Sequence, residues 1–114
     1  MVSASQQLLL DFMSALSSKT ANPVAIHLLL VQQAMHKRGE DSSLTASTKV
    51  SLELFERNAL YRDLKELYTK GMIEFIDTDG KKTIPTEKDI AQAGAGEAVK
   101  FRAVQLTPAA IAKL

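Results

Sequence analysis

The chain contains no cysteine among its 114 residues, which excludes several kinds of chemistry at once. Without thiols there is no disulfide framework, no thiolate metal site and no cysteine nucleophile. The lack of cysteine is compatible with an intracellular protein, and we expect a cytoplasmic one.

Long hydrophobic runs are missing as well. The longest apolar stretch, residues 24–31, contains His27 and is far too short to span a bilayer. No basic residue precedes the first apolar cluster, and Asp11 interrupts it, so we expect neither a secretory signal nor a membrane partner. Apolar residues make up 46% of the chain, which is enough to give one soluble domain a core.

Neither sign of charge is in clear excess. Fourteen basic residues stand against 13 acidic ones, a net charge of +1 that gives weak support to nucleic-acid binding. Residues 57–82 carry six basic and five acidic groups, which again nets +1. A nucleic-acid surface would therefore require the basic groups to gather on one face.

Groupings that could support catalysis or bind a metal are also missing. His27 and His36 would point about 180° apart on one helix, so they cannot share a metal ion. Residues 77–80 look superficially like a calcium loop, but the glycine comes two positions early, and a hairpin turn explains them better. Residues 94–96 are too short for a dinucleotide fingerprint. We expect neither an enzyme nor a cofactor.

A helix followed directly by a strand is the clearest pattern in the sequence. Residues 57–70 have helical periodicity, with Leu60, Leu64, Leu67 and Tyr68 in one sector and Asn58, Arg62, Lys65 and Thr69 opposite. Asn58 suits the N-cap, Gly71 suits a left-handed stop, and the strand at residues 72–76 begins at once. The same pattern would also fit another α+β domain in which the polar face is only solvated.

This segment carries a family resemblance. The run Tyr61-Arg-Asp-Leu-Lys-Glu-Leu, followed by Lys70-Gly-Met-Ile-Glu, resembles the third helix and first wing strand of winged helix-turn-helix regulators of the MarR and PadR kind. The step at residues 106–108 resembles the exit of a wing in the same family. The resemblance covers mainly residues 57–76.

The segments before residue 57 are predicted to be mostly helical. Residues 5–17 form a helix with an apolar stripe, and Asn22 and Pro23 suit the N-cap and first turn of a buried central helix. Residues 48–54 alternate with period two, so a strand that pairs with the wing and a helix that supports residues 57–70 both stay open. In the strand alternative, the first helix of the motif falls within residues 43–47.

The segments after residue 76 are predicted to form the wing. Asp79 and Gly80 predict a type I′ turn, with a return strand at residues 81–84. Residues 86–98 are rich in alanine, glycine and polar groups, and we expect a mobile extension there. Residues 98–106 alternate as a strand, and Thr107-Pro108 begins a short helix.

These elements predict an α+β fold, and the resemblance implies a winged helix-turn-helix domain with an extra N-terminal helix and a short C-terminal helix. One domain covers residues 1–114, with an N-terminal helix (1–18), a central helix (23–38), a recognition helix (57–70), a wing (72–106) and a C-terminal helix (107–114).

The resemblance implies a sequence-specific regulator that binds double-stranded DNA, with the recognition helix in the major groove and the wing on the backbone. The implied DNA-binding residues are Asn58, Tyr61, Arg62, Lys65, Thr69, Lys81 and Lys82. The alternative is a winged-helix module that binds other proteins and not DNA, which Glu66 and the near-neutral charge favour.

A regulator of this kind is expected to be a homodimer, because one helix reads only a few base pairs. The expected interface consists of Leu8, Leu9, Phe12, Met13, Leu16, Ile111 and Leu114. The alternative is that these side chains only complete the core of the monomer.

Overall fold

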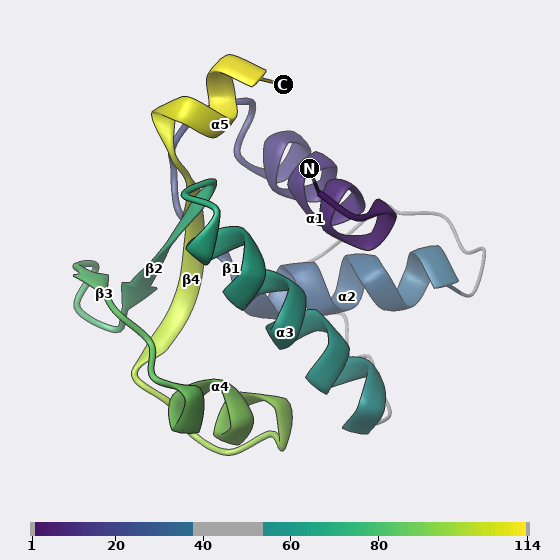
Figure 1. The fold of residues 1–114 in the computed structure, drawn as a ribbon, viewed down its shortest axis with the longest axis vertical. Helices are drawn as coiled ribbons and strands as arrows, with labels where there is room; N and C mark the ends of the chain where they lie inside the picture. Colours follow the sequence, from purple (N-terminus) through teal and green to yellow (C-terminus); the bar gives the residue numbers. More distant parts are fainter. Residues whose placement is uncertain (1, 38–53, 114) are drawn as a thin grey trace.

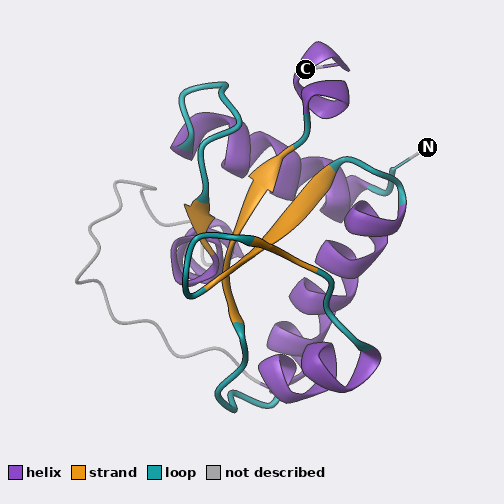
Figure 2. Cartoon of the chain, turned by 90° about the vertical axis from the view of Figure 1, so that its left-hand side faces the viewer, coloured by secondary structure: helices purple, strands orange, loops and turns teal. Residues whose placement is uncertain are grey.

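The computed structural model describes residues 2–37 and 54–113, which form an α+β domain with five helices and a four-stranded antiparallel sheet (Figure 1). In chain order the elements are α1 (Ala4–Leu16), β1 (Val24–Ala25), α2 (Ile26–Lys37), α3 (Leu54–Thr69), β2 (Ile73–Asp77), β3 (Lys82–Thr83), α4 (Glu87–Gly94), β4 (Phe101–Leu106) and α5 (Pro108–Lys113). The sheet order is β1-β4-β2-β3. Helices α1, α2 and α3 lie on one face of the sheet, and Figure 2 looks onto the other.

The central helix begins later than predicted, so the assignment of Asn22 and Pro23 to its N-terminus is wrong. Val24 and Ala25 instead form β1, which pairs antiparallel with Val104 and Ala103 of β4. Pro23 has no amide hydrogen to offer a sheet and is suited to the residue just before a strand. Pairing with β4 also buries the Val24 side chain, which a first helical turn would not require.

Helix α3 begins before Asn58, which therefore lies inside the helix and is not its N-cap. Its C-terminus matches the prediction: Gly71 has a φ of 75°, its amide donates to the Tyr68 carbonyl, and the Met72 amide donates to the Leu67 carbonyl. These two hydrogen bonds form a Schellman motif, which turns the chain directly from α3 into β2. The alternatives for residues 48–54 lie outside the described residues, apart from Leu54, which starts α3.

The hairpin between β2 and β3 is present, but its turn is not type I′. A type I′ turn needs a positive φ at both central residues, and of Asp79 and Gly80 only Gly80 has one, 82°. The Asp77 amide donates to the Lys81 carbonyl, and Asp77 Oδ1 accepts from the amides of Asp79 and Lys81, each at 2.9 Å. The Asp77 carboxylate at the end of β2 thus accepts the hydrogen bonds that close the three-residue loop 78–80.

Strand β4 is interrupted by a bulge that changes which residues face inward. Ile76 pairs with Ala103 whereas Asp77 pairs with Phe101, so Arg102 is the extra residue. A regular strand would have placed Phe101 and Ala103 on the inner face and Val104 on the outer one. Because of the bulge, Phe101, Val104 and Leu106 are buried and Arg102 is exposed.

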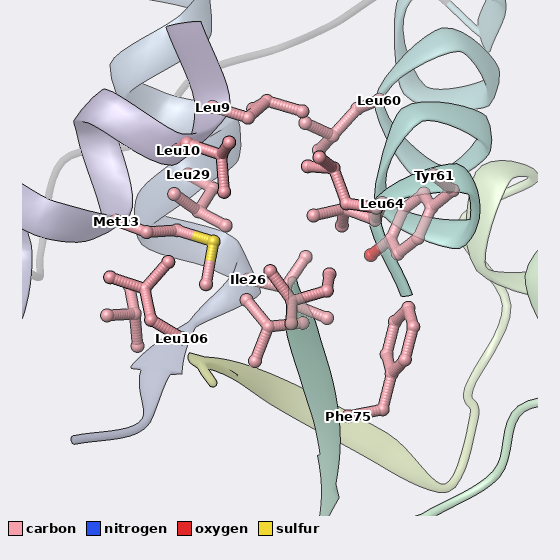
Figure 3. Close-up of a cluster of buried hydrophobic side chains, with 14 of the residues drawn as sticks. Leu9, Leu10, Met13, Ile26, Leu29, Leu60, Tyr61, Leu64, Phe75 and Leu106 are labelled. Carbon is pink, nitrogen blue, oxygen red and sulfur yellow. The ribbon is translucent and has the colours of Figure 1, made fainter. Parts of the chain in front are cut away.

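One hydrophobic core joins the helices to the sheet (Figure 3). Phe75 lies on the sheet side of the cluster, facing Leu64 of α3, and its ring meets that of Phe101 edge to face with centroids 4.9 Å apart. Leu9 and Met13 of α1 face this cluster from the other side and are almost fully buried. The apolar stripe of α1 is therefore part of the core of the monomer.

Candidate nucleic-acid interface

Helix α3 carries the largest group of predicted DNA-binding residues. In the structure some of them are exposed, and others are buried or in contact with α4. Leu60, Leu64 and Leu67 point into the core, as their spacing predicts. Arg62 and Thr69 are exposed on the opposite side, where Glu66 is exposed too. The outward strip of α3 therefore combines one guanidinium, one hydroxyl and one carboxylate.

Glu66 is held by α1. Gln6 is buried at the N-terminus of α1, and its side-chain amide donates to the Glu66 carboxylate, while its oxygen accepts from Lys70 Nζ at 2.9 Å. A capping box with Ser3 fixes the position of Gln6. The Glu66 carboxylate is thus hydrogen-bonded to α1, and the Gln6 side chain links it to Lys70.

Residues 86–98 are not a mobile extension, because residues 87–94 form α4, which packs against α3 (Figure 1). Thr86 is its N-cap: the Asp89 amide donates to Thr86 Oγ1, and the Thr86 amide donates to the Asp89 carboxylate at 3.0 Å. Hydrogen bonds from the backbone and side chain of Thr86 lower the pKa of Asp89. This reciprocal capping starts a helix in a segment whose composition suggested a loop.

Two predicted DNA-binding residues of α3 lie against α4. A Cβ atom built on Gly94 would overlap the side-chain oxygen of Asn58 and lie 3.3 Å from its Cα, so only glycine permits this approach without movement. Two turns further along α3, the Lys65 ammonium forms an ion pair with Glu87 of α4. Asn58 and Lys65 are both only partly exposed.

Tyr61 was expected near the bases but is buried, with 8% of its surface exposed. Its ring lies 6.2 Å from that of Phe101, and burial raises the pKa of its phenol, an effect that the Arg57 guanidinium opposes. Tyr61, Leu64 and Tyr68 are spaced by three and four residues, which is the signal that places Tyr61 with the core. It lines an open cavity of about 530 Å³ together with His27 and Arg102.

The hairpin presents the two predicted wing lysines to solvent. Lys81 follows the turn and is exposed, while Lys82 Nζ lies 2.9 Å from a carboxylate oxygen of Glu74 on β2. Because the Lys82 side chain is 70% exposed, this ion pair is a weak restraint. Ile84 follows with 79% of its surface exposed.

The expected dimer residues serve the monomer to different degrees. Leu9 and Met13 are buried in the core, whereas Leu8, Phe12 and Leu16 are half-buried, and Phe12 and Leu16 pack against the core. Phe12 also meets the ring of His36 edge to face, with centroids 5.9 Å apart. Ile111 is half-buried as well, and Leu114 lies outside the described residues.

Two further features bear on the class of protein. Among residues 2–37 and 54–113, no helix has the length and apolarity needed to cross a membrane, and no three metal-ligating side chains come together. Comparisons with protein families, with curated proteins and with solved structures found no match.

Proposed function

We propose that the chain is a winged-helix regulator that binds double-stranded DNA with α3 in the major groove and the β2–β3 hairpin on the backbone. The observation that carries this proposal is the direct passage from α3 through the Gly71 cap into the hairpin, with Arg62 and Thr69 exposed on the side of α3 opposite the core. The first helix of the motif was expected within residues 43–54, which lie outside the described residues apart from Leu54.

The exposed side chains suggest a division of roles. Arg62 would read guanine through a two-pronged hydrogen bond to O6 and N7, worth about 1–3 kcal/mol of discrimination against other bases. Thr69 Oγ1 already donates its proton to the Lys65 carbonyl in the free protein. It would therefore act toward DNA mainly as a hydrogen-bond acceptor. Lys81 and Lys82 would contact phosphates and set affinity more than sequence preference.

The proposed regulator is a homodimer, with half-sites about 34–36 Å apart on a near-palindromic operator. The half-buried Leu8, Phe12 and Leu16 on α1 support this assignment, because a partner subunit could bury their remaining surface. The core positions of Leu9 and Met13 reduce the apolar area that is free for an interface. Sedimentation at micromolar concentration tests the dimer, and a monomer there removes it.

A protein-interaction module is the second candidate, because α4 covers one flank of the polar face of α3. The ion pair of Lys65 with Glu87 and the contact of Asn58 with Gly94 occupy groups that would otherwise face DNA. Ile84 on the hairpin offers an apolar contact that a phosphate backbone does not need. These features suit a protein partner, although they do not identify one.

The discriminating experiment is fluorescence anisotropy with fragmented source DNA at low and moderate salt. We expect tight, salt-sensitive binding to selected fragments, which Arg62→Ala reduces to fragment-independent binding. Lys82→Ala should lower affinity for all fragments and reduce the slope of log K against log salt by about 1. Lys113→Ala is the matched control, because it removes one exposed charge from α5.

The possible outcomes separate the two candidate functions. Selective binding lost with Arg62→Ala and retained with Lys113→Ala supports the regulator. Equal losses with Arg62→Ala and Lys113→Ala indicate attraction by charge alone and contradict sequence reading by α3. No binding at low salt removes the DNA proposal in favour of a protein partner.

A further inference from the structure

Helix α4 covers part of the α3 surface that is proposed to bind DNA. Asn58 and Lys65 lie on the polar side of α3, on the flank nearest α4, and both contact α4 in the free protein. Arg62 lies between them in sequence and is exposed. The docked α4 therefore leaves one edge of the polar face open and closes the other.

The docked position of α4 is specific. At Gly94 the α4 backbone approaches Asn58 so closely that a Cβ would overlap the Asn58 side chain. At the other end of α4, Glu87 pairs with Lys65. Two contacts at opposite ends of an eight-residue helix fix its position along α3.

The same contact is weakly held. In α4 only Ala93 and Gly94 are buried, and Ile90 is half-buried, so no large side chain anchors the helix fully in the core. The Glu87 side chain is 84% exposed, which makes its ion pair with Lys65 sensitive to salt. Short helices depend on packing for their stability. Helix α4 can therefore undock while the core of the domain stays folded.

We propose that α4 is an autoinhibitory element that must leave α3 before Asn58 and Lys65 can contact duplex DNA. This inference rests on the proposed function. In the docked state only Arg62 and Thr69 of the polar face are available. Undocking exposes Asn58 and frees the Lys65 ammonium, so duplex DNA and α4 compete for one surface. Duplex DNA binding then depends on the fraction of molecules in which α4 has undocked.

The first test removes the cover without altering α3. Gly94→Gln places a long side chain where even a Cβ overlaps Asn58. Because glutamine is a better helix former than glycine, α4 is displaced by this overlap and not by a loss of helix propensity. Ala91→Gln adds the same side chain at an exposed position of α4 and is the matched control. In anisotropy with a short random-sequence duplex, Gly94→Gln should bind about tenfold more tightly than the natural sequence, and Ala91→Gln should bind equally.

The second test locks the cover in place. The chain has no cysteine, so Asn58→Cys with Gly94→Cys introduces one possible disulfide and no competing thiols. A Cβ built at position 94 lies 3.3 Å from the Cα of residue 58, so the two positions are near enough in the docked state for a disulfide to join them, and Asn58→Cys removes the amide oxygen that this Cβ would overlap. The oxidised double variant should bind the duplex at least tenfold more weakly than the same protein after reduction. Each single variant, treated with the same oxidant, controls for the oxidant.

Amide hydrogen exchange checks the state of α4 without DNA. Exchange at the Ile90 and Ala95 amides should be faster than in the natural sequence for Gly94→Gln and slower for the oxidised double variant. If these changes occur and all forms bind the duplex equally, α4 is not inhibitory and only this inference fails. If neither the natural sequence nor Gly94→Gln binds the duplex, the proposed function fails, and the inference fails with it.

Discussion

The junction at Gly71 sets the angle between α3 and the hairpin, and its replacement gives a sharp test of this geometry. Gly71 has a φ of 75°, and no atom lies within 4 Å of a Cβ built on it. Gly71→Ala therefore creates no clash, and its whole effect is the strain of a left-handed backbone. That strain is roughly 1–2 kcal/mol for a residue with a Cβ.

Urea unfolding of the natural sequence, Gly71→Ala and Gly71→Asn measures this strain. We expect Gly71→Ala to lower the free energy of unfolding by about 1–2 kcal/mol with an unchanged m value. In thermal unfolding, each 1 kcal/mol lost should lower Tm by about 4–8 °C for a domain of this size class. Gly71→Asn should lose less, because asparagine tolerates the left-handed region better than alanine does.

The order of the two variants is the critical result. If Gly71→Ala is as stable as the natural sequence, α3 does not end in the Schellman motif described here. If Gly71→Asn is less stable than Gly71→Ala, the loss comes from side-chain crowding at position 71, which contradicts the open space around the Cβ position. A changed m value would mean that the variant alters the unfolded or folded ensemble in addition to straining the turn.

Two further predictions concern the caps of α5 and α4. Thr107 Oγ1 donates to the Gly71 carbonyl and accepts from the Ala110 amide, so Thr107→Ala should cost about 0.5–2 kcal/mol in urea unfolding. Thr107→Ser retains both hydrogen bonds and should restore most of this loss; if both variants are equally unstable, the cap is not the cause. The folded state lowers the pKa of Asp89 from 3.8, so its stabilising effect on α4 is complete above that value and is lost as pH falls through the lower folded-state pKa. NMR shifts of α4 should therefore lose helical character at acid pH in the natural sequence, whereas Asp89→Asn should show a smaller pH dependence; equal dependence would assign the change to another group.

The α3–β2 junction was predictable because its signals are local. Helical spacing of leucines, a glycine and an immediate β-branched run define a helix, a stop and a strand without reference to distant residues. The Thr107-Pro108 start of α5 is similar, since Thr107 Oγ1 accepts from an amide three residues ahead. Local hydrogen bonding is sufficient to determine both features.

Strand β1 and helix α4 were not predicted, because tertiary contacts determine them. Val24 and Ala25 are extended since β4 pairs with them, and β4 lies far away in sequence. Residues 86–98 were expected to be a mobile extension because of their alanine, glycine and polar content, which includes the glycine at position 94. That glycine is favourable because α4 must approach Asn58 closely, which only the packed structure shows.

The misplacement of Tyr61 has a different cause. The family resemblance implied a place near the bases for Tyr61, whereas most of its surface is an aromatic ring that is buried in the core near Phe101. Arg102 shows a similar limit in the strand: period-two alternation assigns faces correctly only while the register is regular, and one bulge inverts every assignment beyond it.

The position of α4 also decides how the two candidate functions are told apart. If α3 reads DNA, displacing α4 with Gly94→Gln exposes Asn58 and Lys65 and strengthens binding. If α4 is instead part of a protein-binding face, the same substitution breaks the ion pair between Glu87 and Lys65 and weakens binding to that protein. One variant therefore changes the two activities in opposite directions. Whether Gly94→Gln strengthens or weakens binding is more informative than the net charge, because a total of +1 does not show which charged groups α4 covers.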